Sequence, residues 1–395
     1  MKILKAGADY SPDARSSIVA AVLLGIVANI SFIIQPGLVG GFVEGLGLGE
    51  QQAGELAAAE MFGIAIATVV LSLASLKVNW RASFLFFSLV AIAGNFVSAY
   101  MVEFTDLVLA RLLSGLGHGG LISLSFSAIG LTSKTDRNIG IYLAVLLSYG
   151  AVGLLVMPSL MALVGLKGIF IGFAAVVLVG IGLVGYLPDQ AKNEGDVPEA
   201  AEPLNIKLLL PALLGYLAYN ISQGIVWAYL FLIGVSNGLG EQVVANALFV
   251  SQVFGVVGAL IAIVVSARVV GRFAPLTIGI LGGAVFIALL LLKVDYFIYL
   301  VAVCGFNLMW NKVLPFILAA ISDFDLRGRV MPFALAIQMF GLAVGPYIAS
   351  QIVGDGNYRA VELASIFFFV LGYILLIVPI MMRKKQQRLE LKKAL

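Results

Sequence analysis

Uninterrupted apolar stretches recur along the whole of this 395-residue chain, and they limit its possible folds more than any other feature. The length of each stretch is close to that of a transmembrane α-helix, which needs about 20 residues to cross the hydrocarbon core of a bilayer. Inside lipid, only helices and closed barrels satisfy all their backbone hydrogen bonds. The pattern predicts an all-α polytopic membrane protein with twelve transmembrane helices. The expected spans are residues 16–42, 55–76, 82–101, 105–132, 139–165, 168–187, 207–235, 242–267, 273–292, 296–321, 330–353 and 361–382.

Charged residues make up only 11% of the chain, and hydrophobic residues make up 61%. Soluble domains carry about 25% charged residues, so a soluble fold is excluded. The single cysteine, Cys304, excludes an intramolecular disulfide, and with the single histidine, His118, it leaves too few ligands for a zinc or haem centre. The chain lacks a phosphate-binding loop of the Gly-x4-Gly-Lys-Ser/Thr type, so nothing supports ATP-driven work. We expect no metal, no cofactor and no nucleic-acid partner.

Basic residues gather on one side of the predicted spans. The N-terminus, the loops after spans 2, 4, 6, 8 and 10, and the C-terminal tail hold nineteen lysines and arginines, whereas the opposite loops hold three: Lys167, Lys293 and Arg359. Cytoplasmic loops of membrane proteins carry the excess of positive charge. We therefore predict that both termini are cytoplasmic, in the cytoplasmic (inner) membrane of a bacterium, and that the chain acts as a monomer.

A polar, acidic, proline-containing segment divides the spans into six plus six, as a flexible cytoplasmic linker would. Asn29-Ile-Ser31 recurs as Asn220-Ile-Ser222, an offset of 191 residues. A second pair, Ser-x-x-Asp at 133 and 322, recurs at an offset of 189, and the agreement favours two parallel six-helix repeats. The predicted organisation is an N-terminal bundle over 1–187, a linker over 188–206, a C-terminal bundle over 207–382 and a basic cytoplasmic tail over 383–395.

One apolar run contains both an arginine and the only histidine of the chain. Arg111 and His118 are seven residues apart, or two helical turns, so both side chains leave the same face of a helix. An arginine at the centre of a bilayer costs about 2.5–3.5 kcal/mol on insertion scales. Such a side chain must turn away from lipid, towards a partner or a wet cavity.

The stretch around these two residues resembles a motif of the major facilitator superfamily. The Arg-x-x-x-Gly-x-Gly pattern of that family is matched by Arg111-Leu-Leu-Ser-Gly115-Leu-Gly117. Twelve spans, a mid-chain cytoplasmic linker and cytoplasmic termini are also typical of the family. The resemblance implies two pseudo-symmetric six-helix bundles that move solutes by alternating access, with spans 1, 4, 7 and 10 around a central cavity.

Other motifs similar to those of the family occur in weaker or altered form. Span 5 has a weak version of the Gly-Pro motif of the family's antiporters, and span 11 has a fuller one. The cytoplasmic signature after span 2 has leucine in place of its aspartate, and the counterpart after span 8 has an arginine near its acidic position. The residues concerned are Gly150-x-x-Gly153-x-x-x-Met157-Pro158, Gly341-x-x-x-Gly345-Pro346, Leu76, Lys77, Asn79 and Arg81, and Arg268 with Gly271-Arg272.

Polar side chains concentrate in the four spans that the resemblance places around the cavity. On spans 7 and 10 they repeat at three- and four-residue spacings, which gives one continuous face on each helix. Ser31 and Gln35 align in the same way on span 1, whereas Asn29 points elsewhere. Tyr216 and Tyr219 share the face on span 7. The predicted substrate-binding residues are Gln35, Arg111, His118, Asn220, Gln223, Trp227, Asn307, Trp310, Asn311 and Lys312.

Glu60 and Arg111 enter their spans from the same side and lie about 8 Å deep, at the helical rise of about 1.5 Å per residue. A pair between them would satisfy both charges, and His118 titrates near neutral pH. We predict that Glu60, Arg111 and His118 couple transport to protons. The alternatives are a static salt bridge, a neutral imidazole bonded between helices, and, for Trp227 and Trp310, ordinary helix packing.

The cations Arg111, His118 and Lys312, with only Glu60 to balance them, favour a solute with a carboxylate or other anionic group. We predict a secondary active transporter of a small organic solute that works by alternating access and proton coupling. One alternative is a proton-coupled efflux pump for amphipathic compounds. Another is a non-transporting receptor or sensor on the same scaffold. An enzyme is not expected, because the sequence contains no nucleophile–base pair or metal-ligand set.

Overall fold

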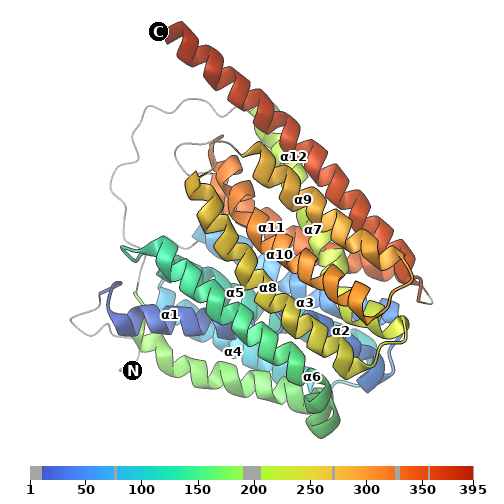
Figure 1. The fold of residues 1–395 in the computed structure, drawn as a ribbon. Coiled ribbons are helices and arrows are strands. Elements are labelled where there is room, and N and C mark those ends of the chain that lie inside the picture. The colour runs from blue at the N-terminus through green and yellow to red at the C-terminus, as the bar shows by residue number, and fades with distance from the viewer. Residues whose placement is uncertain are drawn as a thin grey trace. The chain divides into compact units, whose positions relative to one another are not determined.

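A computed structural model describes residues 11–74, 78–189, 206–268, 272–324, 330–354 and 356–394. These residues form twelve α-helices and two short 3-10 helices, so the predicted all-α class is confirmed (Figure 1). Ten of the described helices are long and apolar enough to cross a membrane. The protein is therefore a multi-pass membrane protein.

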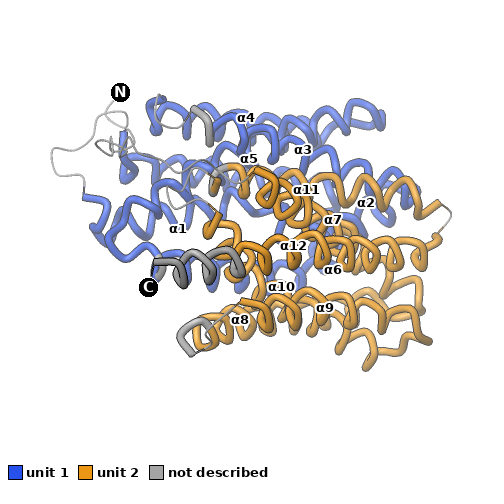
Figure 2. The backbone as a smooth tube through the Cα atoms, turned by 90° about the horizontal axis from the view of Figure 1, so that it is seen from above, with its two compact units in different colours: residues 1–195 blue, residues 196–395 orange. Residues whose placement is uncertain are grey.

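The chain divides into two compact units, residues 1–195 and residues 196–395, which Figure 2 shows in different colours. Most of the segment predicted as a linker, residues 190–205, lies outside the described residues. The segment predicted as a tail continues the last helix to residue 394, and its side chains beyond residue 383 are not described.

Six α-helices and one 3-10 helix form the N-terminal unit. They are α1 (Arg15–Ala28), α2 (Gln35–Leu46), α3 (Glu50–Ala74), α4 (Trp80–Ser98), α5 (Phe104–Gly130), α6 (Thr135–Gly180) and η1 (Ile181–Tyr186). The C-terminal unit has the same number of each. They are α7 (Ile206–Ser236), α8 (Glu241–Arg268), α9 (Phe273–Ala288), η2 (Leu289–Leu291), α10 (Tyr296–Ser322), α11 (Val330–Val353) and α12 (Tyr358–Ala394).

The first predicted span is not one helix, which corrects the sequence analysis. Helix α1 ends at Ala28, and α2 begins at Gln35. Pro36 lies in the first turn of α2, where it has no backbone N–H to donate and disfavours helical geometry in the preceding residue. Ser31 therefore lies in the break and Gln35 in the next helix, so the expected alignment of these two residues on one helical face is wrong.

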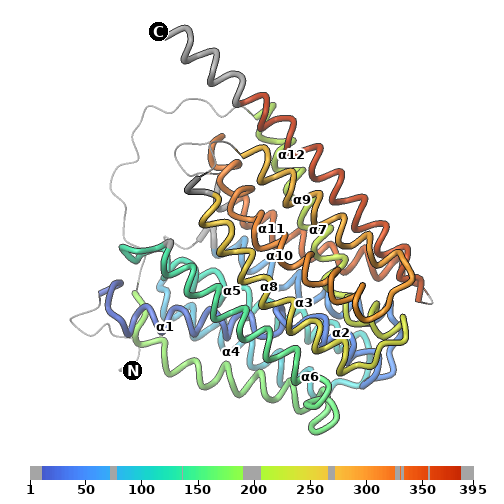
Figure 3. Tube along the Cα trace, viewed as in Figure 1, coloured from blue at the N-terminus to red at the C-terminus, as the bar shows by residue number. Residues whose placement is uncertain are grey.

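Helix α6 contains the fifth predicted span and most of the sixth, whose last part forms η1 (Figure 3). Inside it, Gly165 has φ 63° and ψ −179°, which interrupts the helical path. This backbone conformation costs glycine little because it has no Cβ. The interruption lies at the predicted boundary between the two spans, so a break in α1–α2 and a kink in α6 explain why helices and spans do not correspond one to one.

Glycines bring α5 very close to its two neighbours in the N-terminal unit. A Cβ built on Gly115 would overlap the backbone of Glu60 in α3, and one on Gly117 would overlap Ala91 in α4. From the other side, Gly94 of α4 meets the backbone of Ser114. The glycines of the Arg-x-x-x-Gly-x-Gly pattern thus allow α5 to pack between α3 and α4, and this packing places Arg111 beside the polar residues of both helices.

The C-terminal unit uses the same kind of packing between α7 and α11. A Cβ on Gly345 would meet the backbone of Gly224 and Ile225, and one on Gly341 would meet Asn220. The Gly-Pro motif of span 11 is therefore the surface that packs against the polar face of α7. Small residues are typical of membrane helices whose backbones approach this closely.

Candidate functional site

An ion pair between Glu60 of α3 and Arg111 of α5 forms the centre of a buried polar cluster in the N-terminal unit. Oε1 of Glu60 is in contact with Nη2 of Arg111, and it also accepts a hydrogen bond of 2.7 Å from the hydroxyl of Ser31. Arg111 has no exposed surface, and Glu60 is 5% exposed. The break between α1 and α2 thus adds a third residue to the cluster, because it brings Ser31 to the carboxylate.

Asn95 of α4 joins this ion pair to His118. Its Oδ1 accepts a hydrogen bond of 3.0 Å from Nη1 of Arg111, and its Nδ2 lies 3.1 Å from Nε2 of His118. The carbonyl of Ala91 accepts a second hydrogen bond of 3.0 Å from the same Nδ2. Asn95 and His118 have no exposed surface. The structure therefore brings Glu60, Arg111 and His118 together, with Asn95 between the last two.

Two further contacts surround this cluster. The guanidinium carbon of Arg111 lies 4.6 Å from the ring centroid of Phe170, in the second half of α6, within the range of a cation–π interaction. The His118 ring lies near the end of α1, and its buried Nδ1 has no hydrogen-bond partner among the described residues. Gln35, predicted as a substrate ligand, is buried in α2, and no described hydrogen bond links it to the cluster.

The polar face predicted on α7 is buried and has unused hydrogen-bonding capacity. Nδ2 of Asn220 donates a hydrogen bond of 2.7 Å to the carbonyl of Tyr216. The hydroxyl of Tyr216 donates one of 2.9 Å to Oε1 of Gln338 in α11. Oδ1 of Asn220 and Oε1 of Gln223 are buried and have no hydrogen-bond partner among the described residues. These two carbonyl oxygens could accept hydrogen bonds from a bound solute.

The amides predicted on α10 bond to each other and to α8. Nδ2 of Asn307 lies 3.1 Å from Oε1 of Gln252 and 3.3 Å from the hydroxyl of Ser251. Nδ2 of Asn311 donates a hydrogen bond of 2.9 Å to Oδ1 of Asn307. These contacts tie α10 to α8, which the sequence analysis did not foresee.

The two predicted tryptophans are in contact. Their ring centroids are 5.8 Å apart at an interplanar angle of 79°, an edge-to-face arrangement. Phe306 extends the cluster, with its centroid 5.6 Å from that of Trp310. Lys312, two residues beyond this ring, is half-buried, and no ion pair is formed by it in the described parts of the chain.

Residues that the sequence analysis missed complete both polar networks. Asn95, Ser251, Gln252 and Gln338 are all buried and polar. Each interrupts an apolar run, which is the only signal that the sequence offers for them. The C-terminal unit also buries a carboxylate, Glu362 of α12, which interacts electrostatically with Arg359.

The predicted cytoplasmic ends hold arginines in two different ion pairs. Nε of Arg81 lies 2.9 Å from Oδ1 of Asp189 and donates a hydrogen bond of 2.7 Å to the carbonyl of Leu187. Nη1 of Arg272 lies 2.5 Å from Oδ2 of Asp323. The remaining members of the two altered signatures, Leu76, Lys77, Gly271 and the side chain of Arg268, lie outside the described residues.

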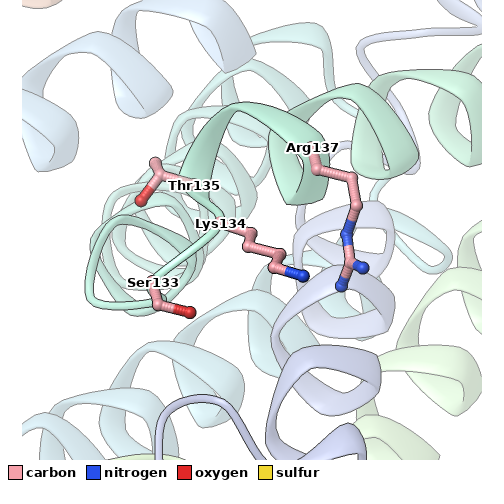
Figure 4. Close-up of a pocket in the computed structure, with 4 residues that line it drawn as sticks. All are labelled: Ser133, Lys134, Thr135 and Arg137. Atoms are coloured by element: carbon pink, nitrogen blue, oxygen red, sulfur yellow. The ribbon is translucent and has the colours of Figure 1, made fainter.

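Figure 4 shows a shallow hollow at the turn between α5 and α6, lined by Ser133, Lys134, Thr135 and Arg137. Ser133 is bound to Asp13. The backbone N–H and the hydroxyl of Ser133 each donate a hydrogen bond of 2.8 Å to Oδ1 of Asp13. The hollow lies just after the C-terminal end of α5, whereas Arg111 lies near the N-terminal end of that helix. Its side chains are mainly exposed, and it contains none of the predicted site residues.

Long apolar helices around buried charges define a polytopic membrane transporter. The sequence model of the Major Facilitator Superfamily matches residues 18–324, so the chain belongs to this family, whose members are transporters and not enzymes. A similar fold is found in the crystal structure of a D-xylose-proton symporter, with a TM-score of 0.68. The match covers 90% of this chain and 96% of that one at 16% sequence identity, which shows a shared fold. No curated protein matches the sequence.

Proposed function

We propose that this family member is a proton-coupled secondary active transporter for a small organic solute with an anionic group. The observation that supports the proposal is the buried carboxylate of Glu60, which forms an ion pair with Arg111 and accepts a hydrogen bond from Ser31. We further propose that the chain works by alternating access in the cytoplasmic membrane of a bacterium, with both termini in the cytoplasm.

Arg111 can exchange one anionic partner for another. Its guanidinium donates only, and it is fully buried, so an anion must always lie close to it. A substrate carboxylate that approached Arg111 would compete with Glu60. A buried carboxylate without a cation is costly, so Glu60 would then take up a proton. This exchange would bind one proton for each anionic solute without an uncompensated charge in the membrane.

The C-terminal unit has polar and aromatic groups of its own that suit a small organic solute. Asn220 and Gln223 have carbonyl oxygens without partners among the described residues, and Trp227 and Trp310 form an edge-to-face aromatic pair. Lys312 adds a positive charge near Asn311 in sequence.

The aromatic cluster favours a second candidate, efflux of amphipathic compounds. Trp227, Trp310 and Phe306 form a continuous aromatic group, which suits a flat apolar ligand as well as it suits part of a small acid. The two candidates differ in the direction of accumulation and in the charge of the compound that binds.

A ligand screen followed by a transport assay tests the proposal. Purified protein is heated with small carboxylates, their neutral amide analogues and cationic amphipathic drugs, because a ligand of the folded state raises Tm. The best ligand is then assayed in proteoliposomes with an imposed pH gradient. We expect Glu60→Gln to abolish accumulation and to retain exchange of solute across the membrane.

Glu103→Gln is the matched control, because Glu103 is an exposed carboxylate at the start of α5, outside the cluster. This variant should accumulate solute as the unmodified protein does. Accumulation by Glu60→Gln at the unmodified rate would refute proton coupling through this carboxylate. Stabilisation by cationic drugs alone would favour the efflux candidate.

A further inference from the structure

The side-chain amide of Asn95 is held in one orientation by its neighbours. Arginine has five N–H donors and no acceptor, so the Asn95 atom that faces Nη1 of Arg111 must be the oxygen. The nitrogen then faces the carbonyl of Ala91 and Nε2 of His118, at 3.0 and 3.1 Å. Turning the amide over would place N–H groups against the guanidinium and a carbonyl against a carbonyl.

The fixed amide determines which nitrogen of His118 carries the proton. Nδ2 of Asn95 has two protons, one for Ala91 and one for His118. Nε2 of His118 must therefore accept, which it can do only without a proton of its own. In a neutral imidazole the proton then lies on Nδ1. Nδ1 of His118 is buried and forms no hydrogen bond with a described residue, so the contacts of Asn95 alone determine the position of the proton.

We propose that Asn95 is a positioning residue that keeps the proton of neutral His118 on Nδ1 and makes protonation of Nε2 depend on the bond between Arg111 and Asn95. While Arg111 holds Oδ1, the amide cannot turn and Nε2 cannot be protonated. When Arg111 leaves Asn95, the amide is free to turn and to offer its oxygen to an Nε2–H. Asn95 thus transmits the position of Arg111 to His118.

The charged surroundings of His118 are few. Glu60 from α3 and Arg111 from α5 itself are the charged groups that interact with the ring in the described residues. Helix α4 contributes the Asn95 amide, and α1 contributes backbone groups. Glu60 and Arg111 form an ion pair, so a change in their pairing is the charge change that reaches the histidine. The role in coupling rests on the proposed function, whereas the position of the proton does not.

The single histidine makes a direct test possible. The full chain is produced with [15N]histidine and purified through a tag without histidine, so both ring signals in an NMR spectrum come from His118. Protonated and unprotonated imidazole nitrogens differ clearly in 15N chemical shift. We expect, near neutral pH, an N–H signal from Nδ1 and an acceptor signal from Nε2. A protonated Nε2 in the unmodified protein overturns the proposal, whatever the variants do.

The variant Asn95→Asp should move the proton of His118 from Nδ1 to Nε2. A carboxylate accepts from both Arg111 and His118, so Nε2 should become protonated in this variant. Asn138→Asp is the matched control, because Asn138 is also buried in the N-terminal unit but bonds to Thr132. The control should keep the Nδ1–H signal. An Asn95→Asp spectrum that still shows unprotonated Nε2 would overturn the proposed role of the amide.

The transport assay separates this inference from the proposed function. If Asn95 transmits the state of Arg111, Asn95→Asp should change the pH profile of solute accumulation while Asn138→Asp leaves it unchanged. A reversed proton position with an unchanged pH profile would refute the coupling role of Asn95. If Glu60→Gln accumulated solute normally, proton coupling through Glu60 would fail, and the assignment of the His118 proton would stand.

Discussion

Arg111 has partners on three different helices of the N-terminal unit. It contacts the carboxylate of Glu60, the amide of Asn95 and the ring of Phe170, and it is fully buried. Removal of one member of a buried ion pair costs about 3–5 kcal/mol, because the other charge is left without compensation. The stability of the N-terminal unit and the proposed coupling therefore depend on the same contacts.

A double-mutant cycle measures this dependence. We expect Arg111→Leu to lower the free energy of unfolding by about 3–5 kcal/mol, and Arg111→Leu with Glu60→Leu to lower it by less than the sum of the two single changes. The measurement is denaturant unfolding of each variant in the same detergent. Additive losses would show that Glu60 and Arg111 do not interact.

Lys312 tests the charge of the solute. A charge-assisted hydrogen bond contributes about 1.5–3 kcal/mol, so Lys312→Gln should weaken binding of a carboxylate roughly tenfold to a hundredfold. A neutral amide analogue should lose much less affinity. Lys293→Gln, at an exposed lysine of the segment before α10, is the control. Equal losses for the carboxylate and the amide would assign Lys312 a structural role.

The sequence predicted part of this cluster at residue resolution. Glu60 and Arg111 could be paired from their depth in two helices, and Arg111 and His118 from their spacing. Asn95 could not, because its contacts depend on how α4 is rotated about its axis, which the close approach of Gly94 to Ser114 determines. Ser31 was assigned to the wrong neighbour because the break in the first span was not foreseen.

At the scale of helices, the glycines of α5 determine whether the cluster can form. Gly115 lies against the backbone of Glu60, so any side chain there would separate α5 from α3. The Arg-x-x-x-Gly-x-Gly pattern therefore has two functions. Its arginine supplies the charge, and its glycines allow the carboxylate of the neighbouring helix to reach that charge.

Two alanine substitutions on the same helix test this view. Gly115→Ala should lower the free energy of unfolding by about 1–3 kcal/mol, the usual cost of overpacking, and reduce transport with it. Gly130→Ala is the control, because no described atom lies within 4 Å of the added Cβ, and alanine favours a helix. Thermal unfolding in detergent gives both values, and equal stability of the two variants would contradict the packing argument.

Breaks in helices were harder to predict than the helices themselves. Apolar length identifies a membrane-crossing stretch whether or not its helix is continuous, so the first span appeared unbroken in the sequence. Pro36 and the polar side chain of Asn29, which bonds to the carbonyl of Gly25, were the local signals of the break. Gly165 lies where the boundary between the fifth and sixth spans was expected.

At the scale of the molecule, the apolar runs and the span 4 motif were sufficient to predict the fold class and the family. Both are confirmed by the helices and by the family match over residues 18–324. The orientation in the membrane stays a prediction, since it rests on the distribution of lysine and arginine.

Topology tags measure that orientation. Tags at both ends of the chain and in residues 190–202 should be accessible from the cytoplasm, and tags in residues 45–52 and 354–359 should be accessible from outside. Because each loop reports independently, a reversed protein and a wrongly counted span give different patterns. A tag in residues 190–202 that is accessible from outside would refute the six-plus-six arrangement.

Proton movement driven by solute tests the central claim most directly. Proteoliposomes are loaded with a pH-sensitive dye, clamped at zero membrane potential and given a gradient of the solute that binds best. The unmodified protein should change the internal pH as solute crosses, and Glu60→Gln should move solute without a change in pH. Solute flux without proton movement in the unmodified protein, or unchanged proton movement in Glu60→Gln, would contradict coupling through the Glu60–Arg111 pair.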